Sequence, residues 1–250
     1  RTIWELGLEH VQAHQVAYRL AAIRGDSAEM QRHLDWLKQE ATGRMRMSAY
    51  TAPSRLARML GKFKAAEQLL AQASDVFKLE KPLGVDPAAW ARVAAYDHAA
   101  VGNCERARAV KFVYTSIMCG SLDEAQAMAD KALRPADLLS SRVFHPMQTA
   151  WIAHRRGDNQ KALALSEPVA ARYGVLGGTE LFKIRGLAHL GLGDGKAAAA
   201  EFQQIIDRRG LDPASNEFTI DYPLAYVYSG RAWQMAGDLP DRARLRHQAG

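Results

Sequence analysis

The sequence predicts an all-α protein built as an α-solenoid, a stack of about six to seven antiparallel helical hairpins. Three observations lead to this prediction. Glycine turns recur at the spacing of one hairpin, small residues recur at fixed distances from those glycines, and β-branched residues never alternate over a useful length. We expect one repeat array over residues 1–250.

Each predicted hairpin consists of an apolar helical run, a turn that begins with Gly, and a second helical run. The turns are Gly25-Asp26, Gly61-Lys62, Gly102-Asn103, Gly120-Ser121, Gly157-Asp158, Gly193-Asp194 and Gly237-Asp238. Consecutive glycines are 36, 41, 18, 37, 36 and 44 residues apart. Glycine suits these turns because it adopts, without steric cost, the left-handed conformation that ends a helix.

Small residues flank the turns on both sides. Five of the seven residues five positions past the glycines are alanine; the series is Met30, Ala66, Ala107, Ala125, Ala162, Ala198 and Arg242. Five of the six residues found seven positions before a glycine are small; that series is Tyr18, Ser54, Ala95, Ala150, Gly186 and Gly230. Small side chains let two helices approach closely, so we expect these positions at the helix crossings. Segments rich in Pro, Gly and Asp at 81–84, 134–137, 173–178 and 211–221 predict the loops between hairpins.

One interval departs from the pattern. Gly102 and Gly120 are 18 residues apart, too few for a complete second helix, a loop and a complete first helix. Either one helix is shared and the array loses half a repeat, or a segment is missing from the chain near 109–110. The spacing slightly favours the missing segment.

The sequence of 179–206, TELFKIRGLAHLGLGDGKAAAAEFQQII, resembles a tetratricopeptide repeat, with Phe182, Gly186, the Gly193 turn, Ala198 and Phe202 at the spacings of that family. Residues 222–238 resemble the first half of another repeat, and the earlier units match more loosely. Residues 198–210 are similar to the tetratricopeptide regions attached to bacterial eukaryotic-type Ser/Thr kinases and winged-helix regulators. This resemblance implies a right-handed superhelix, and a scaffolding or sensing segment of a larger signalling protein.

The resemblance also implies a binding surface, because the first helices of the family's hairpins line the concave face. The expected partner-binding residues lie two, three or six positions before the turn glycines: Arg19, Arg55, Arg58, Tyr96, Trp151, His154, Arg155 and Arg231. Arginine recognises carboxylates and aromatic residues provide apolar anchoring, so we expect a non-catalytic module that binds an acidic protein or peptide segment. The alternative is a small-ligand sensor with a closed apolar pocket near Trp151.

Other functional classes find little support in the residues. No nucleophile elbow, phosphate-binding loop or kinase signature occurs, so we expect no enzyme activity and no cofactor. His10 and His14 share a helix face without a third ligand, which favours packing over a metal site. The net charge of +6 is spread along the chain, which argues against nucleic acid. No apolar run approaches the length of a membrane span, so we expect no membrane insertion.

The two cysteines bear on the compartment. Cys104 and Cys119 are too few for a disulfide framework and are expected to be small core residues of a reducing compartment, although one bridge between them stays open. The prediction is a cytoplasmic protein. The alternative is the extracytoplasmic part of a membrane-anchored signalling protein.

Overall fold

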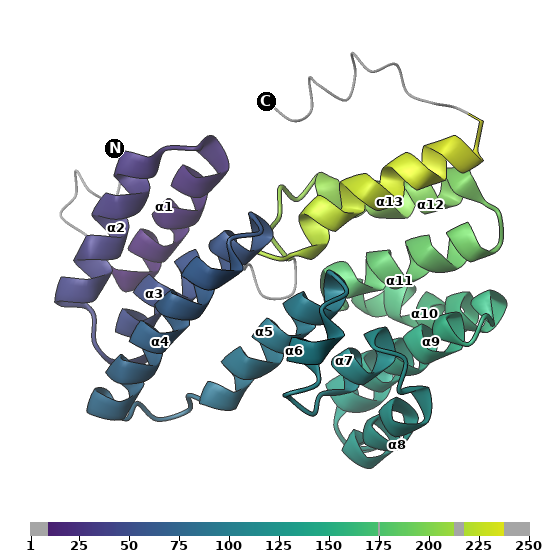
Figure 1. Cartoon of the computed structure of the whole chain (residues 1–250), viewed down its shortest axis with the longest axis horizontal. Coiled ribbons are helices and arrows are strands. Elements are labelled where there is room, and N and C mark those ends of the chain that lie inside the picture. Colours follow the sequence, from purple (N-terminus) through teal and green to yellow (C-terminus); the bar gives the residue numbers. More distant parts are fainter. Residues whose placement is uncertain (1–9, 175, 213–217, 238–250) are drawn as a thin grey trace. The chain divides into compact units, whose positions relative to one another are not determined.

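The computed structural model describes residues 10–174, 176–212 and 218–237, and these residues are all-α (Figure 1). In chain order the helices are α1 (Val11–Arg24), α2 (Ser27–Glu40), α3 (Gly43–Met59), α4 (Phe63–Glu80), α5 (Pro87–Ala100), α6 (Cys104–Ala107), α7 (Val113–Met118), α8 (Leu122–Ala132), η1 (Ser140–Phe144), α9 (His145–Arg155), α10 (Asn159–Tyr173), α11 (Gly178–Gly191), α12 (Gly195–Ile206) and α13 (Asp221–Met235). The described part contains no strand, only a single bridge between Leu211 and Phe218. The predicted fold class, a solenoid of consecutively paired helices, is confirmed.

The hairpin turns follow from local backbone chemistry. All seven predicted turn glycines have positive φ, between 71° at Gly25 and 88° at Gly120. The next residue donates its N–H back across the helix end, as in Asp158 N–H to the Ala153 carbonyl at 2.9 Å, which is the bond of a Schellman motif. The side chains of Asp26, Asn103, Asp158 and Asp194 then cap the second helix. One dipeptide therefore ends the first helix and starts the second.

Small residues lie at the helix crossings, as expected. The five alanines five positions past a turn glycine, Ala66, Ala107, Ala125, Ala162 and Ala198, are fully buried. Gly186 shows why a small residue is required, because a Cβ there would lie 2.5 Å from the Phe202 ring. Arg242, the last residue of that predicted series, lies outside the described residues.

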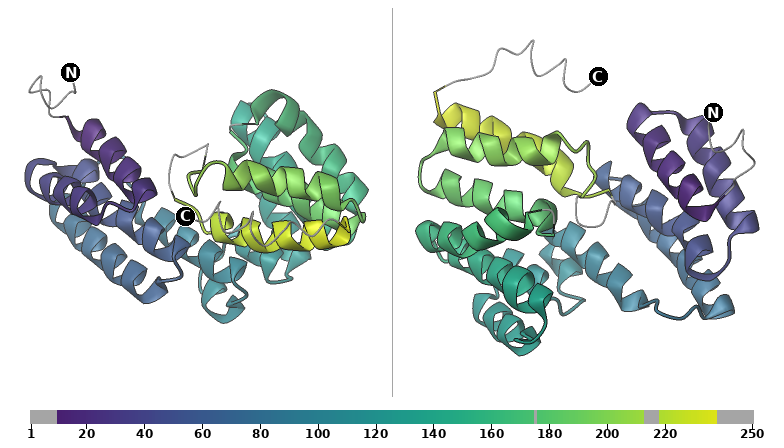
Figure 2. Two further views of the ribbon diagram at one scale, coloured as in Figure 1. Left: turned by 90° about the horizontal axis from the view of Figure 1, so that it is seen from above. Right: turned by 180° about the vertical axis from the view of Figure 1, so that it is seen from behind.

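The chain divides into two compact units, Arg1–Trp90 and Ala91–Gly250, so the boundary falls within α5. In unit 1, α1 packs on α2 and α3 packs on α4. In unit 2, α9 to α13 lie side by side in succession (Figure 2). The first helices α7, α9, α11 and α13 also pack on one another in that order, so they share one face of the unit.

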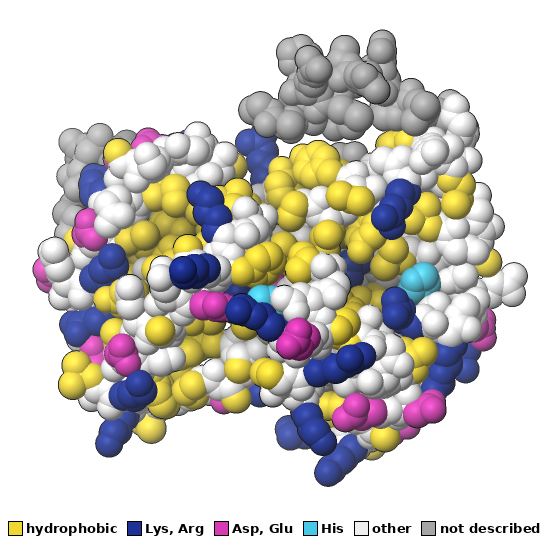
Figure 3. Space-filling view, in the orientation of Figure 1, with side chains coloured by type: hydrophobic (Ala, Val, Ile, Leu, Met, Phe, Trp, Pro, Cys, Tyr) yellow, Lys and Arg dark blue, Asp and Glu magenta, His cyan; other side chains and the backbone are white. Residues whose placement is uncertain are grey.

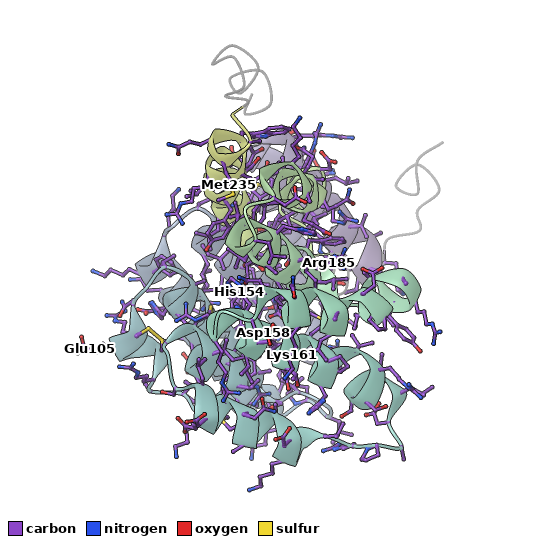
Figure 4. All side chains as sticks on the ribbon, turned by 90° about the vertical axis from the view of Figure 1, so that its right-hand side faces the viewer. Glu105, His154, Asp158, Lys161, Arg185 and Met235 are labelled. Atoms are coloured by element: carbon purple, nitrogen blue, oxygen red, sulfur yellow. A yellow bond between two sulfur atoms is a disulfide. The ribbon has the colours of Figure 1, made fainter. Side chains whose placement is uncertain are left out.

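The irregular interval contains two short helices, α6 with 4 residues and α7 with 6 residues. A disulfide joins Cys104 on α6 to Cys119 at the end of α7, and Figure 4 shows it as a yellow bond near Glu105. The expectation of two free core thiols is therefore wrong: both cysteines are partly exposed and bonded to each other. A cross-link is useful here because helices this short have little stability of their own.

Candidate functional site

Aromatic side chains from three successive first helices of unit 2 meet on the shared face. They are Tyr96 of α5, Tyr114 of α7 and Trp151 of α9, each six positions before its turn glycine. The ring centroids are 6.2 Å apart for Tyr96 and Tyr114, 5.5 Å for Tyr114 and Trp151, and 6.3 Å for Tyr96 and Trp151. The same position in consecutive hairpins therefore points to the same place.

Lys183 of α11 lies against two of these rings, those of Tyr96 and Trp151. The Lys183 ammonium lies 4.4 Å from the centre of the Trp151 ring and 4.6 Å from that of Tyr96, within the range of cation–π attraction. It also forms an ion pair of 2.8 Å with Asp221 at the start of α13. The two charged side chains are 3% and 1% exposed. The place where the sensor alternative expects an apolar pocket, beside Trp151, is therefore occupied by protein atoms.

Hydrogen bonds complete the site around Asp221. The hydroxyls of Tyr96 and Thr179 each donate to an Asp221 oxygen at 3.0 Å, and Lys183 also hydrogen-bonds to the Tyr96 hydroxyl. Tyr96 and Asp221 are 125 residues apart, so this contact joins α5 directly to α13. We call the group the Lys183 cluster; its members are Tyr96, Tyr114, Trp151, Thr179, Glu180, Lys183 and Asp221.

Burial controls the protonation of the cluster. Loss of solvent raises the pKa of Glu180 to about 7, and the nearby carboxylates of Asp221 and Asp212 raise it further, while Lys183 and a hydrogen bond with Tyr114 oppose the shift. Burial likewise raises the pKa of both Tyr96 and Tyr114 well above their ordinary value, so the two hydroxyls stay protonated. The buried charges are thus the Lys183–Asp221 pair, with Glu180 close to its midpoint at neutral pH.

The structure places the other predicted residues of unit 2 nearer to solvent. Arg155 is exposed, and its guanidinium donates to the Met118 carbonyl at 3.3 Å. Arg231 is also exposed and lies over the ring of Tyr228 at 5.9 Å. His154, labelled in Figure 4, is partly buried against Asn159 at 2.7 Å, and burial lowers its pKa.

The three remaining predicted residues belong to unit 1. Arg19 lies on α1, and Arg55 and Arg58 lie on α3. Arg58 is 3% exposed, whereas Arg19 and Arg55 are partly buried. Their proposed role in binding a partner stays a prediction. Of the predicted residues in unit 2, Tyr96 and Trp151 lie in ring contact.

Sequence reasoning missed most of the Lys183 cluster. Tyr114 lies six positions before Gly120, so the repeat register could have found it had the interval before Gly120 been included. Lys183 lies ten positions before Gly193, on the same helical stripe as the residue six before it. Asp221 follows a loop and carries no periodic signal, so only the tertiary structure shows its role.

The described residues contain no group of three or more His, Cys, Asp or Glu side chains that could hold a metal. His10 caps α1, while His14 is buried, stacks on Trp36 at 3.8 Å and meets His33 with 3.0 Å between their Nδ1 atoms. On the face shown in Figure 3, Lys and Arg side chains are dispersed among hydrophobic, other uncharged, and Asp and Glu side chains. Among the described helices, none is both long and apolar enough to cross a membrane.

Comparisons of the chain with protein-family models, with curated proteins and with solved structures give no match.

Proposed function

We propose that the chain is a tetratricopeptide-like interaction module that binds an acidic peptide segment of a partner protein on the first-helix face of unit 2. The observation that carries this proposal is the meeting of Tyr96, Tyr114 and Trp151. Because these residues occupy one register position, Leu187 of α11 and Arg231 of α13, at the same position, continue the face.

The Lys183 cluster supports the proposal because its contacts hold the helices of this face together. A buried ion pair holds α11 to α13, and the Tyr96 hydroxyl ties α5 to the same carboxylate. A surface that is already ordered loses little conformational entropy when a peptide binds, which favours affinity. Solenoids commonly bind partners on such extended faces.

The exposed arginines define the chemistry of the partner. Arg155 and Arg231 lie near the ends of α9 and α13, and neither forms an ion pair among the described residues. Their planar guanidinium groups can receive a carboxylate through two hydrogen bonds. The net charge of +6 adds long-range attraction for an acidic segment.

Selection from a random peptide library on the immobilised chain tests the proposal. We expect the wild-type chain to enrich Asp- and Glu-containing peptides, and Arg155→Glu with Arg231→Glu to weaken their binding by about 10- to 100-fold, or about 1.4–2.7 kcal/mol. The matched control is Lys131→Glu with Lys161→Glu, because these exposed lysines lie on the second helices α8 and α10. Equal losses of peptide affinity in the two double variants would show that only the net charge matters, and would contradict the proposal.

A further inference from the structure

The Cys104–Cys119 disulfide lies where small molecules can reach it from solution. Both cysteines are partly exposed, and their neighbours Asn103, Glu105 and Gly120 are exposed. A disulfide in this setting is open to attack by a thiolate from solvent. The chain has only these two cysteines, so a small thiol can exchange with it at this one place.

Arg108 contacts both halves of the bond. Its backbone N–H donates to the Cys104 carbonyl at 3.1 Å, and its guanidinium donates to the Cys119 carbonyl at 2.8 Å. Arg155 of α9 donates to the carbonyl of Met118, the residue before Cys119, at 3.3 Å. Because the acceptors are neutral carbonyls, these two exposed guanidinium groups keep their positive charge beside the disulfide.

The charge around the bond is positive on balance. Between the two cysteines the chain carries three cations, Arg106, Arg108 and Lys111, and one carboxylate, that of Glu105. At the start of α8, the Asp123 carboxylate is paired with Arg156 of the α9–α10 turn at 2.7 Å. A small thiol that carries a carboxylate is therefore attracted to the bond, whereas one that carries an ammonium group is repelled.

We infer that the Cys104–Cys119 bond is a site of thiol–disulfide exchange with small thiols that carry carboxylates. The thiolate of one small molecule attacks a cysteine sulfur, breaks the S–S bond and forms a mixed disulfide, and the other cysteine leaves as a thiolate. A second small thiolate attacks the mixed disulfide and releases the remaining cysteine. The protein thiolates take up the protons that the two small thiols lost, so the protein disulfide is reduced and the small thiols are oxidised to their own disulfide.

Reduction of the bond acts on the shared face of unit 2 through α7. Cys119 ends this helix, which has 6 residues and carries Tyr114 of the Lys183 cluster. A helix this short depends on tertiary contacts and cross-links for its stability. We therefore expect reduction to speed hydrogen exchange in α7 before it affects α9 or α11. This effect does not depend on the proposed peptide binding.

Three thiols of similar size test the charge preference on the oxidised full chain: 3-mercaptopropionate, 2-mercaptoethanol and cysteamine. Mass spectrometry after alkylation follows the reduction and detects the mixed disulfide. The measured quantity is the ratio of the 3-mercaptopropionate rate to the cysteamine rate, because a structural loosening of the bond raises both rates alike. We expect Arg108→Gln to lower this ratio about threefold at low salt, Glu105→Gln to raise it about threefold, and both effects to disappear at about 1 M salt.

The matched control is Arg172→Gln, which removes the same charge from α10, a second helix that packs on α9 and α11. Its ratio should equal that of the wild-type chain, and so should the ratio of Arg108→Lys, which keeps the charge. An unchanged ratio in Arg108→Gln, or an equal fall in Arg172→Gln, overturns the preference for carboxylate-bearing thiols. A bond that none of the three thiols reduces in the folded chain overturns the exchange site itself.

Hydrogen exchange of the reduced wild-type chain completes the test. Faster exchange in α7, reproduced by Cys104→Ser with Cys119→Ser, supports the role of the bond in holding this helix, and unchanged exchange in α7 overturns that role. Failure of the peptide selection, or loss of peptide binding in the Arg155 and Arg231 variant, leaves the exchange site standing, because neither result involves the reaction of the disulfide.

Discussion

The two units hold polar groups in their interiors in different ways. In unit 1, His14 and His33 meet across one hairpin, 19 residues apart in the sequence. In unit 2, the Lys183 cluster joins residues up to 125 positions apart and contains a full ion pair. The histidine pair thus links two neighbouring helices, whereas the cluster links the first helices α5, α7, α9, α11 and α13. The difference shows that contacts between neighbouring residues of the repeat can hold one hairpin together. The shared face of unit 2, in contrast, is held by contacts between residues far apart in the sequence.

Removal of Asp221 should have the largest effect on this comparison. Asp221→Ala leaves the Lys183 ammonium and the hydroxyls of Tyr96 and Thr179 without their acceptor, which should cost about 3–5 kcal/mol of unfolding free energy. Replacement of both charges, Lys183→Met with Asp221→Leu, should cost less because no unpaired charge remains. Segment-resolved hydrogen exchange should show this loss of stability in α11 and α13 and not in α1 to α4. An equal loss of stability in both units would contradict the assignment of the cluster to unit 2 alone.

The pH response of unit 2 should come next in size. The folded-state pKa of Glu180 is raised from 4.5 to about 7, so its contribution is fully present below 4.5 and is lost as the pH rises through 7. The unfolding free energy of unit 2 should therefore fall by up to about 3 kcal/mol between pH 4.5 and 7. Glu180→Gln should remove most of this slope in urea denaturation, and an unchanged slope would contradict the assignment.

Unit 1 should respond to pH in the opposite direction, by a smaller amount. Burial and the neighbouring Arg32 lower the pKa of His33, while Glu29 opposes the shift. The histidine contribution is therefore present above 6.5 and is lost as the pH falls. Protonation of His33 also leaves its ring able only to donate in the contact with His14, and the effect should be about 1 kcal/mol, the size of one hydrogen bond. In the wild-type chain, hydrogen exchange in α1 and α2 should therefore show a loss of stability as the pH falls below 6.5. We expect His33→Leu to remove this loss. If the loss persists in the variant, the histidine pair is not its cause.

The disulfide gives a local test within unit 2, where its effect is expected in two short helices. Its cysteines are 15 residues apart, a loop whose cross-link is worth about 3 kcal/mol in the chain-entropy account. Because α6 and α7 are already short, reduction should appear first as faster exchange in these two helices. Mass spectrometry after alkylation, with and without dithiothreitol, checks the bond, and free thiols before reduction would contradict it.

The sequence predicts the hairpins well because their turns are local. Gly157 needs a left-handed conformation and Ala162 needs a small volume, and both requirements are visible at fixed spacing. The cluster could be predicted only in part, since Tyr96 and Trp151 follow the register but Asp221 does not. No local rule brings residues 96, 183 and 221 together, because their contact depends on how successive hairpins stack. The sequence also leaves the disulfide open, because a bond between Cys104 and Cys119 depends on how the two short helices α6 and α7 pack.

The central claim is that the first-helix face of unit 2 binds an acidic peptide. Hydrogen exchange of the full chain with a peptide selected from the library tests it most directly. The account predicts slower exchange in α9, α11 and α13, with no change in the second helices α10 and α12. Protection confined to α10 and α12, or no protection in unit 2, would contradict it.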